Sequence, residues 1–189
     1  MTRKRWLCLP VLLSVIVLGC ATAQVYMKPG INFSQYKRIA VLRFDSSFSS
    51  AVGQEVSDTI GLEFSRKGYN VIERSQLKAI IAEEQLEQYG LTEPNKIELR
   101  LAGINAIVVG SISRYDCFAH QQLIPFMGTI IPLITNNCHV SLSCKMLDVD
   151  TGELIWAANG AHSMDDVNMT ANKVLQEVLK KISREIPSS

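Results

Sequence analysis

Apolar and polar residues alternate along the chain in segments that predict an ordered succession of strands and helices. Strands are expected where short apolar runs lie between turn residues, over 38–44, 69–73, 106–112, 140–149 and 154–161. Helices are expected where apolar residues recur every three or four positions, over 52–67, 75–90, 92–103 and 167–182. Ser163 and Asp166 resemble a capping box that would begin the last helix. This order predicts one α/β domain with a single mixed sheet of parallel and antiparallel strands packed by helices.

The first 19 residues have the pattern of a signal peptide. Basic residues 3–5 precede an uncharged apolar run over 6–18, which is shorter than the ~20 residues that a spanning helix needs. The run ends in a lipobox that resembles the bacterial lipoprotein signal, formed by Val17, Leu18, Gly19 and Cys20. We therefore expect residues 1–19 to be removed and Cys20 to carry the covalent lipid. Ala21, in place of aspartate, favours sorting to the periplasmic face of the outer membrane.

The segment after the cysteine is expected to be a lipid-anchored tether. Residues 20–35 contain Pro29, Gly30 and mixed polar residues, and the extended segment would reach roughly 50 Å. Residues 36–186 then form the folded domain. Without residues 1–19 the chain keeps 16 of its 19 basic residues and all 18 acidic ones, so its formal charge falls from +1 to −2. This balance, without a basic stripe, argues against nucleic-acid binding.

Three cysteines remain for the folded domain, in a compartment where disulfides persist. Cys117 and Cys138 flank a 20-residue segment and would lie opposite each other across an antiparallel pair, so we expect a disulfide between them. In that register Cys144 would face Ser111 as a small buried residue. Metal binding by both flanking cysteines with the nearby histidines is the alternative. It lacks a recognised ligand spacing, and we expect no metal.

An apolar run interrupts the predicted sheet. The insertion covers residues 115–139, and its centre, residues 123–134, is apolar nearly throughout. Such a patch typically marks an interface. The residues expected to form it are Leu123, Ile124, Phe126, Met127, Ile130, Ile131, Leu133 and Ile134. The alternatives are that the segment folds back over the core of the domain or pairs as a short hairpin. As an interface, it would meet the lipid surface, a neighbouring copy or a partner protein.

Four sequence blocks resemble the family of the curli secretion channel subunit, the CsgG-like family. They are YKRIAVLRF at 36–44, YNVIERSQL at 69–77, AIVVGSI at 106–112 and LDVDTGELIW at 147–156. The resemblance implies a fold similar to the N-terminal domain of TolB. It also implies a bacterial envelope lipoprotein, because lipoprotein members of the family include channel subunits and LpoB-type activators of cell-wall synthases.

The chain departs from the channel subunits of that family, which carry two membrane hairpins that assemble into a shared barrel. The insertion is apolar without alternation, and Pro125 and Pro132 are expected to interrupt its ladder hydrogen bonds. A second hairpin would fall between 161 and 165, where there is no room. We therefore expect a lipoprotein that acts through protein–protein contacts in envelope assembly or secretion, as a homo-oligomer or with an envelope partner. The alternatives are an activator of a peptidoglycan synthase, for which the tether is short, and a pore subunit.

Several groups of residues in the sequence could form a catalytic site, but no recognised catalytic motif supports any of them. The candidates are Ser57 with Asp58, His162 with Asp165 and Asp166, and Glu83 with Glu84. The chain has no G-x-S-x-G turn, no H-E-x-x-H helix and no glycine-rich phosphate loop. We expect a protein that is not an enzyme and that uses no cofactor and no small-molecule substrate.

Overall fold

Three long antiparallel strands dominate the computed structural model, which describes residues 22–72, 76–77 and 92–189. They are β5 (Ala106–Phe126), β6 (Thr129–Asp148) and β7 (Leu154–Asp166). The described strands form one sheet in the order β1-β7-β6-β5-β2-β4, with β3 also paired to β5. β2 (Arg38–Val41), β3 (Asp45–Ser46) and β4 (Asn70–Ile72) add the parallel part of the sheet. The predicted single mixed sheet is confirmed.

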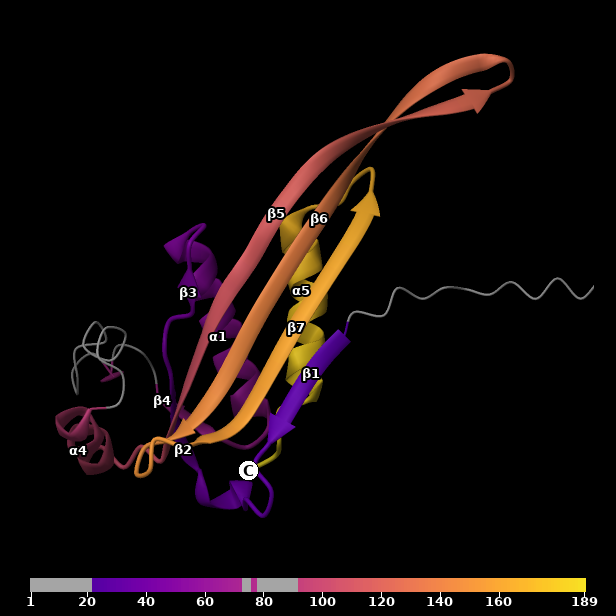
Figure 1. Ribbon diagram of the computed structural model, residues 1–189. Helices are drawn as coiled ribbons and strands as arrows, with labels where there is room; N and C mark the ends of the chain where they lie inside the picture. Colours follow the sequence, from indigo (N-terminus) through magenta and orange to yellow (C-terminus); the bar gives the residue numbers. More distant parts are fainter. Residues whose placement is uncertain (1–21, 73–75, 78–91) are drawn as a thin grey trace, which may run out of the picture.

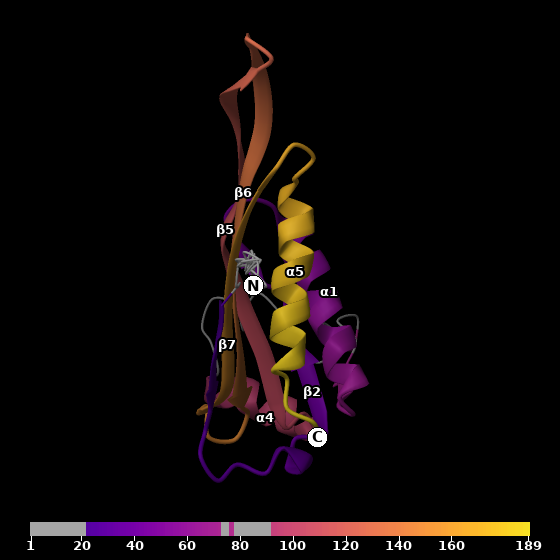
Figure 2. The ribbon, with the colours of Figure 1, turned by 90° about the vertical axis from the view of Figure 1, so that its right-hand side faces the viewer.

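Two helices cover one face of this sheet, α1 (Ser50–Arg66) and α5 (Ala171–Arg184) (Figures 1 and 2). The larger core lies between them and the strands. It contains Leu142 from β6, Trp156 from β7 and Val178 from α5, each at most 1% exposed. α5 lies so close to the sheet that a Cβ atom at Gly160 of β7 would come within 2.8 Å of the Val178 side chain.

A smaller core forms on the other side of β2, near α4 (Glu93–Leu101). Ala40 and Leu42 belong to this smaller core, whereas Ile39 and Val41 belong to the larger one. Successive side chains of a strand point to opposite faces, so β2 is buried on both sides. None of the described helices is long and apolar enough to cross a membrane.

The predicted tether is wrong from residue 22 onward. Residues Thr22–Met27 form β1, which pairs antiparallel with β7 from Thr22 opposite Ala161 to Met27 opposite Trp156. A short 3-10 helix, η1 (Phe33–Gln35), then leads into β2. The physical reason is that β7 would otherwise present a row of unpaired backbone groups, and β1 satisfies them. The predicted signal peptide, Cys20 and most of the helix expected at 75–90 lie outside the described residues.

The predicted start of the last helix is also wrong. β7 continues to Asp166, because its pairing with β6 extends to Asn136 opposite Asp166. Ser163 and Asp166 therefore lie on a strand. The helix begins after Thr170, whose side chain accepts a hydrogen bond from the Lys173 backbone N–H.

A bulge in β5 changes the predicted register of the cysteines. Ile112 lies opposite Leu142 and Arg114 opposite Ser141, so Ser113 is an extra residue in the ladder. Cys144 consequently faces Gly110 rather than Ser111. Ser111 faces Ser143 instead, and their hydroxyl oxygens lie 2.9 Å apart in a hydrogen bond.

Candidate interaction surface

The insertion is a β-hairpin that extends beyond the folded body, and we call residues 115–139 the arm (Figures 1 and 2). The pairing of β5 with β6 continues without a further register shift to Phe126 opposite Thr129. Met127 and Gly128 close the hairpin with φ values of 48° and 79°. Two positive φ angles in a two-residue loop are typical of a type I′ turn, which suits the twist of paired strands. The arm therefore pairs as a hairpin and does not fold back over the core.

The prediction that the two prolines interrupt this ladder is wrong. Pro125 lies opposite Ile130, and Pro132 lies opposite Leu123. The pair that closes a two-residue turn is hydrogen-bonded, and hydrogen-bonded and non-hydrogen-bonded pairs then alternate along the ladder. Both prolines fall in non-hydrogen-bonded pairs, where the backbone nitrogen points away from the partner strand. The hairpin therefore requires no N–H from either proline.

The end of the arm exposes its apolar side chains to solvent. We call residues 123–134 the tip. Leu123 and Ile130 are each 65% exposed, and Met127 at the turn is 91% exposed. Among the eight residues expected to form an interface, seven are exposed and Leu133 is half-buried. No described part of the chain covers the tip, so it is available for an external contact.

The predicted disulfide between Cys117 and Cys138 joins the two strands near the base of the arm, and we call this level the neck. Cys117 and Cys138 are direct cross-strand partners with a Cα–Cα distance of 4.0 Å. Cys138 is buried and Cys117 is exposed. Next to this neck, the Asn136 side-chain amide donates a hydrogen bond to the Met169 carbonyl at 3.2 Å. The base of the arm is thereby joined to the segment that precedes α5.

The third cysteine lies in the core and cannot act as a nucleophile. Cys144 is fully buried, and burial raises the pKa of its thiol, although a hydrogen bond from the Lys145 backbone acts in the opposite direction. A neutral buried thiol is a poor nucleophile and a poor metal ligand. Within the described residues, no three His, Cys, Asp or Glu side chains gather as a metal site.

The catalytic candidates do not come together. The Ser57 hydroxyl donates to the Gly53 carbonyl at 2.7 Å, within its own helix. Asp58 accepts hydrogen bonds from the Gln54 amide on the exposed side of that helix. Neither contact activates a nucleophile. Glu83 and Glu84 lie outside the described residues.

The histidine candidate is separated from its carboxylates along the extended strand β7. Asp165 and Asp166 lie three and four residues beyond His162, which places their Cα atoms roughly 10–13 Å away. Burial lowers the pKa of His162, and the nearby Lys181 lowers it further. Glu177 on α5 acts in the opposite direction, but the imidazole does not pair with Asp165 or Asp166 as an acid–base constellation would require.

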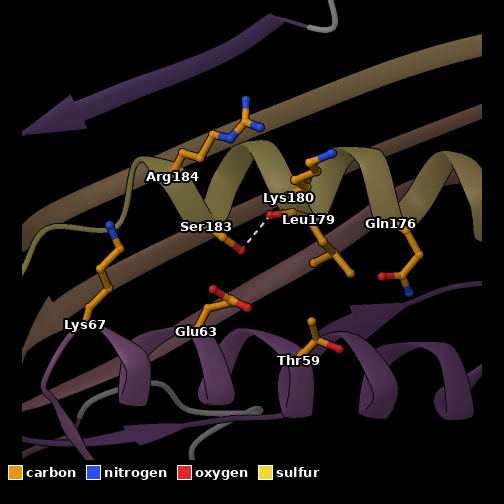
Figure 3. Close-up of a pocket in the computed structure, with 8 residues that line it drawn as sticks. All are labelled: Thr59, Glu63, Lys67, Gln176, Leu179, Lys180, Ser183 and Arg184. Carbon is orange, nitrogen blue, oxygen red and sulfur yellow. Dashed lines mark hydrogen bonds between the residues drawn. The ribbon is translucent and has the colours of Figure 1, made fainter.

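A groove of about 410 Å³ lies between α1 and α5 (Figure 3). Among the residues that line the groove, Ser183 donates a hydrogen bond from its hydroxyl to the Leu179 carbonyl at 2.7 Å, and Glu63 forms an ion pair with Arg66. Lys180 and Arg184 extend away from Glu63 (Figure 3). Ser183 and Glu63 are thus each paired within their own helix, so the arm is the stronger candidate for function.

Comparison with solved structures finds the same fold in PelC and a weaker similarity to a bacterial lipoprotein. PelC from Paraburkholderia phytofirmans, solved as a dodecamer, is 13% identical, with 90% of this chain and 100% of that chain covered and a TM-score of 0.57. Lipoprotein GNA1162 from Neisseria meningitidis is 16% identical, with 78% and 98% covered and a TM-score of 0.48. No curated protein matches the sequence.

The comparison with protein families agrees with the resemblance of the four sequence blocks. The model of the family described as curli production assembly/transport component CsgG matches residues 13–180, which include the arm and every described strand. The chain therefore belongs to the CsgG family.

Proposed function

We propose that the protein is a non-enzymatic lipoprotein of the bacterial outer membrane. Its lipid on Cys20 holds it at the periplasmic face, where it acts as a homo-oligomer through protein–protein contacts in envelope assembly or secretion. The observation that carries this proposal is the arm, a hairpin that projects from the folded body and whose apolar tip is not covered by any described part of the chain. A hairpin built in this way serves contact rather than core stability.

The position of β1 favours this function over activation of a peptidoglycan synthase. Thr22 is already paired in the sheet, so only Ala21 lies between it and Cys20, a distance of two residue steps. Two extended residues span ~7 Å, compared with the roughly 50 Å of a free tether. A body anchored in this way stays beside the membrane and cannot reach the cell wall, where such a synthase acts.

Three further findings support self-assembly. Membership of the CsgG family connects the chain to a transport component, and the similar PelC protein forms a dodecamer. β1 is an edge strand, and its Val25, Tyr26 and Met27 are partly exposed. An exposed apolar edge of this kind is suited to contact with another copy.

Expression with a labelled fatty acid, followed by fractionation and light scattering in detergent, tests the proposal. We expect the parent protein to carry the label, to fractionate with the outer membrane and to have the mass of several copies. Cys20→Ala should lose the label and remain an uncleaved precursor, because alanine offers no thiol for the lipid. A labelled C20A variant, or a parent protein that is monomeric and unlabelled, contradicts the proposal.

A further inference from the structure

We propose that the tip of the arm inserts into the acyl-chain region of one membrane leaflet, without crossing the bilayer. This inference rests on the lipid anchor of the proposed function, but it assigns a separate contact to the tip. The first observation is that the tip is apolar on both faces. Leu123 and Ile130 point to one face, Ile124 and Phe126 to the other, and all four are exposed.

Apolar residues on both faces indicate the same environment on both sides. A hairpin that docks on one protein surface buries one face and leaves the other in water, which favours an alternating pattern. The tip lacks that alternation, and Met127 at its end is the most exposed of the large apolar side chains described. A lipid leaflet surrounds an inserted segment completely, so it suits both faces and the turn.

The charges of the arm fit this location. No Asp, Glu, Lys or Arg occurs between Asp116 and Lys145, so both strands of the arm are uncharged from the neck to the turn. Below the tip, the uncharged polar residues His120, Gln121 and Gln122 would lie at the level of the lipid headgroups. A charged side chain in the hydrocarbon would carry a large cost, and here none would enter it.

The length of the tip matches one leaflet. Residues 123–126 rise ~14 Å along the strand at ~3.4 Å per residue, and half of a hydrocarbon core of ~30 Å is about 15 Å. The tip can therefore enter one leaflet and is too short to reach the opposite surface.

The prolines occupy two of the outward-facing backbone positions of the tip, one on each edge of the hairpin. An unpaired backbone N–H in hydrocarbon is costly. Pro125 lies on the outer edge of β5 and Pro132 on the outer edge of β6, so each removes one outward donor. The same prolines discourage a neighbouring copy from adding a strand to either edge. They favour a hairpin that lies in lipid by itself over one that is paired into a continuous sheet.

The anchor and the tip lie toward the same end of the sheet. The chain enters β1 at Thr22, which is level with Ala161, Ser141 and Arg114. The arm continues from that level, and its end bends toward the side of the sheet that β1 borders (Figure 1). Nine residues separate Arg114 from Leu123, or roughly 30 Å. A lipid on Cys20 and an inserted tip would hold the protein at two points of one membrane if the arm lies along the membrane surface and its bent end enters the leaflet.

Tryptophan quenching tests this proposal in the full lipidated protein, reconstituted in vesicles of phosphatidylethanolamine and phosphatidylglycerol. F126W places an indole in the tip, and F118W places one at an exposed position lower on the same arm as the matched control. Trp156 is fully buried and contributes equally to both variants. With lipids brominated on their acyl chains, we expect F126W to lose most of its added emission and F118W to keep most of it. If brominated lipid quenches the added emission of the two variants equally, the proposal is overturned.

The spectrum also identifies the alternative occupant. If the F126W emission shifts to shorter wavelength without quenching by brominated lipid, another copy or a partner covers the tip, and leaflet insertion is wrong. The fatty-acid label, measured on the same preparation, reports on the proposed function separately. An unlabelled protein overturns the anchor, whereas a labelled protein with an unquenched tip overturns only the insertion.

A second variant tests the role of the prolines. P125A with P132A, in the F126W background, restores one outward N–H on each edge of the hairpin. We expect weaker quenching by brominated lipid and a larger mass in detergent, because the restored edges can pair with those of a neighbour. Quenching and mass equal to those of F126W alone would overturn the role assigned to the prolines.

Discussion

β5 and β6 pair along almost their whole length, but apolar and polar residues are arranged differently in the body and in the tip. In the body, Leu142 faces the helices and is buried, while Ser111 and Ser143 lie half-buried on the opposite face. In the tip, the neighbouring residues Leu123 and Ile124 point to opposite faces, and both are apolar and exposed. The alternation of apolar and polar residues in the body thus reflects two faces with different surroundings, one of them covered by α1 and α5. Its loss, in the same two strands, records an environment that is alike on both sides.

The strongest challenge to this comparison is the same substitution made in each region. Leu142→Ala should lower the free energy of unfolding by about 2–5 kcal/mol, because it leaves a cavity beneath α5. Leu123→Ala in the tip should change it by no more than about 0.5 kcal/mol. Urea unfolding of both variants measures the difference. Equal losses would show that the tip packs into a core.

Removal of the disulfide tests the boundary between the two regions. Cys117→Ala combined with Cys138→Ala should lower the free energy of unfolding by about 3 kcal/mol in the chain-entropy model, because the bond closes a loop with a sequence separation of 21. Reductant should destabilise the parent by a similar amount and leave the double variant unchanged. If the parent is insensitive to reductant and peptide mapping finds free thiols at both positions, the bond does not form.

A hydrogen bond at the base of the body sharpens the contrast with the uncharged arm. The Tyr36 hydroxyl donates to Asp148 at 2.8 Å. Burial alone would raise the pKa of Asp148, but hydrogen bonds from Thr151 and Tyr36 outweigh it and leave the pKa below its usual 3.8. A lowered carboxyl pKa adds stability above the unfolded pKa, and that stability is lost as the pH falls through the folded pKa.

Tyr36→Phe should therefore cost about 1–2 kcal/mol near neutral pH. The difference from the parent should shrink once the pH falls below the usual aspartate range of about 4. Urea unfolding at several pH values measures this effect. A difference that stays constant down to strongly acidic pH would mean that the ring contributes through packing rather than through the carboxylate.

The smallest expected effect on stability comes from the tip. Combined replacement of Ile124, Phe126, Ile130 and Ile134 by Ser should leave the melting temperature nearly unchanged, because all four side chains are exposed. Binding to vesicles or self-association should fall. A variant that unfolds would place the tip in the core, and a folded variant that binds vesicles and associates like the parent would remove the tip from function.

Much of the body could be predicted from the sequence, because its pattern reflects burial. The apolar run at 106–112 lies within β5, the run at 140–149 coincides with β6 up to Asp148, and the periodic apolar residues of 52–67 and 167–182 locate α1 and α5. Each of these segments packs against a core, and the core imposes a period of two or of three to four residues.

The elements that the sequence did not reveal depend on distant partners. β1 is a short edge strand followed by Pro29 and Gly30, so its local pattern is that of a loop, and only the open edge of β7 makes it a strand. The bulge at Ser113 has no local signal and moves the register by one residue. The apolar tip and the two cysteines that flank it could be found from the sequence. That both prolines fall in non-hydrogen-bonded pairs could not, because this depends on where the turn begins the alternation of pairs.

The pairing of β1 also has a consequence for biogenesis. Residues 22–27 lie beside residues 156–161, near the opposite end of the chain, so the edge of the sheet cannot close until nearly all of the polypeptide is available for pairing. With Cys20 acylated, the amino-terminal strand would wait at the membrane surface for its partner to emerge. The sheet of the body would then be completed at the membrane surface, and the membrane would hold the first strand while the rest of the chain folds onto it.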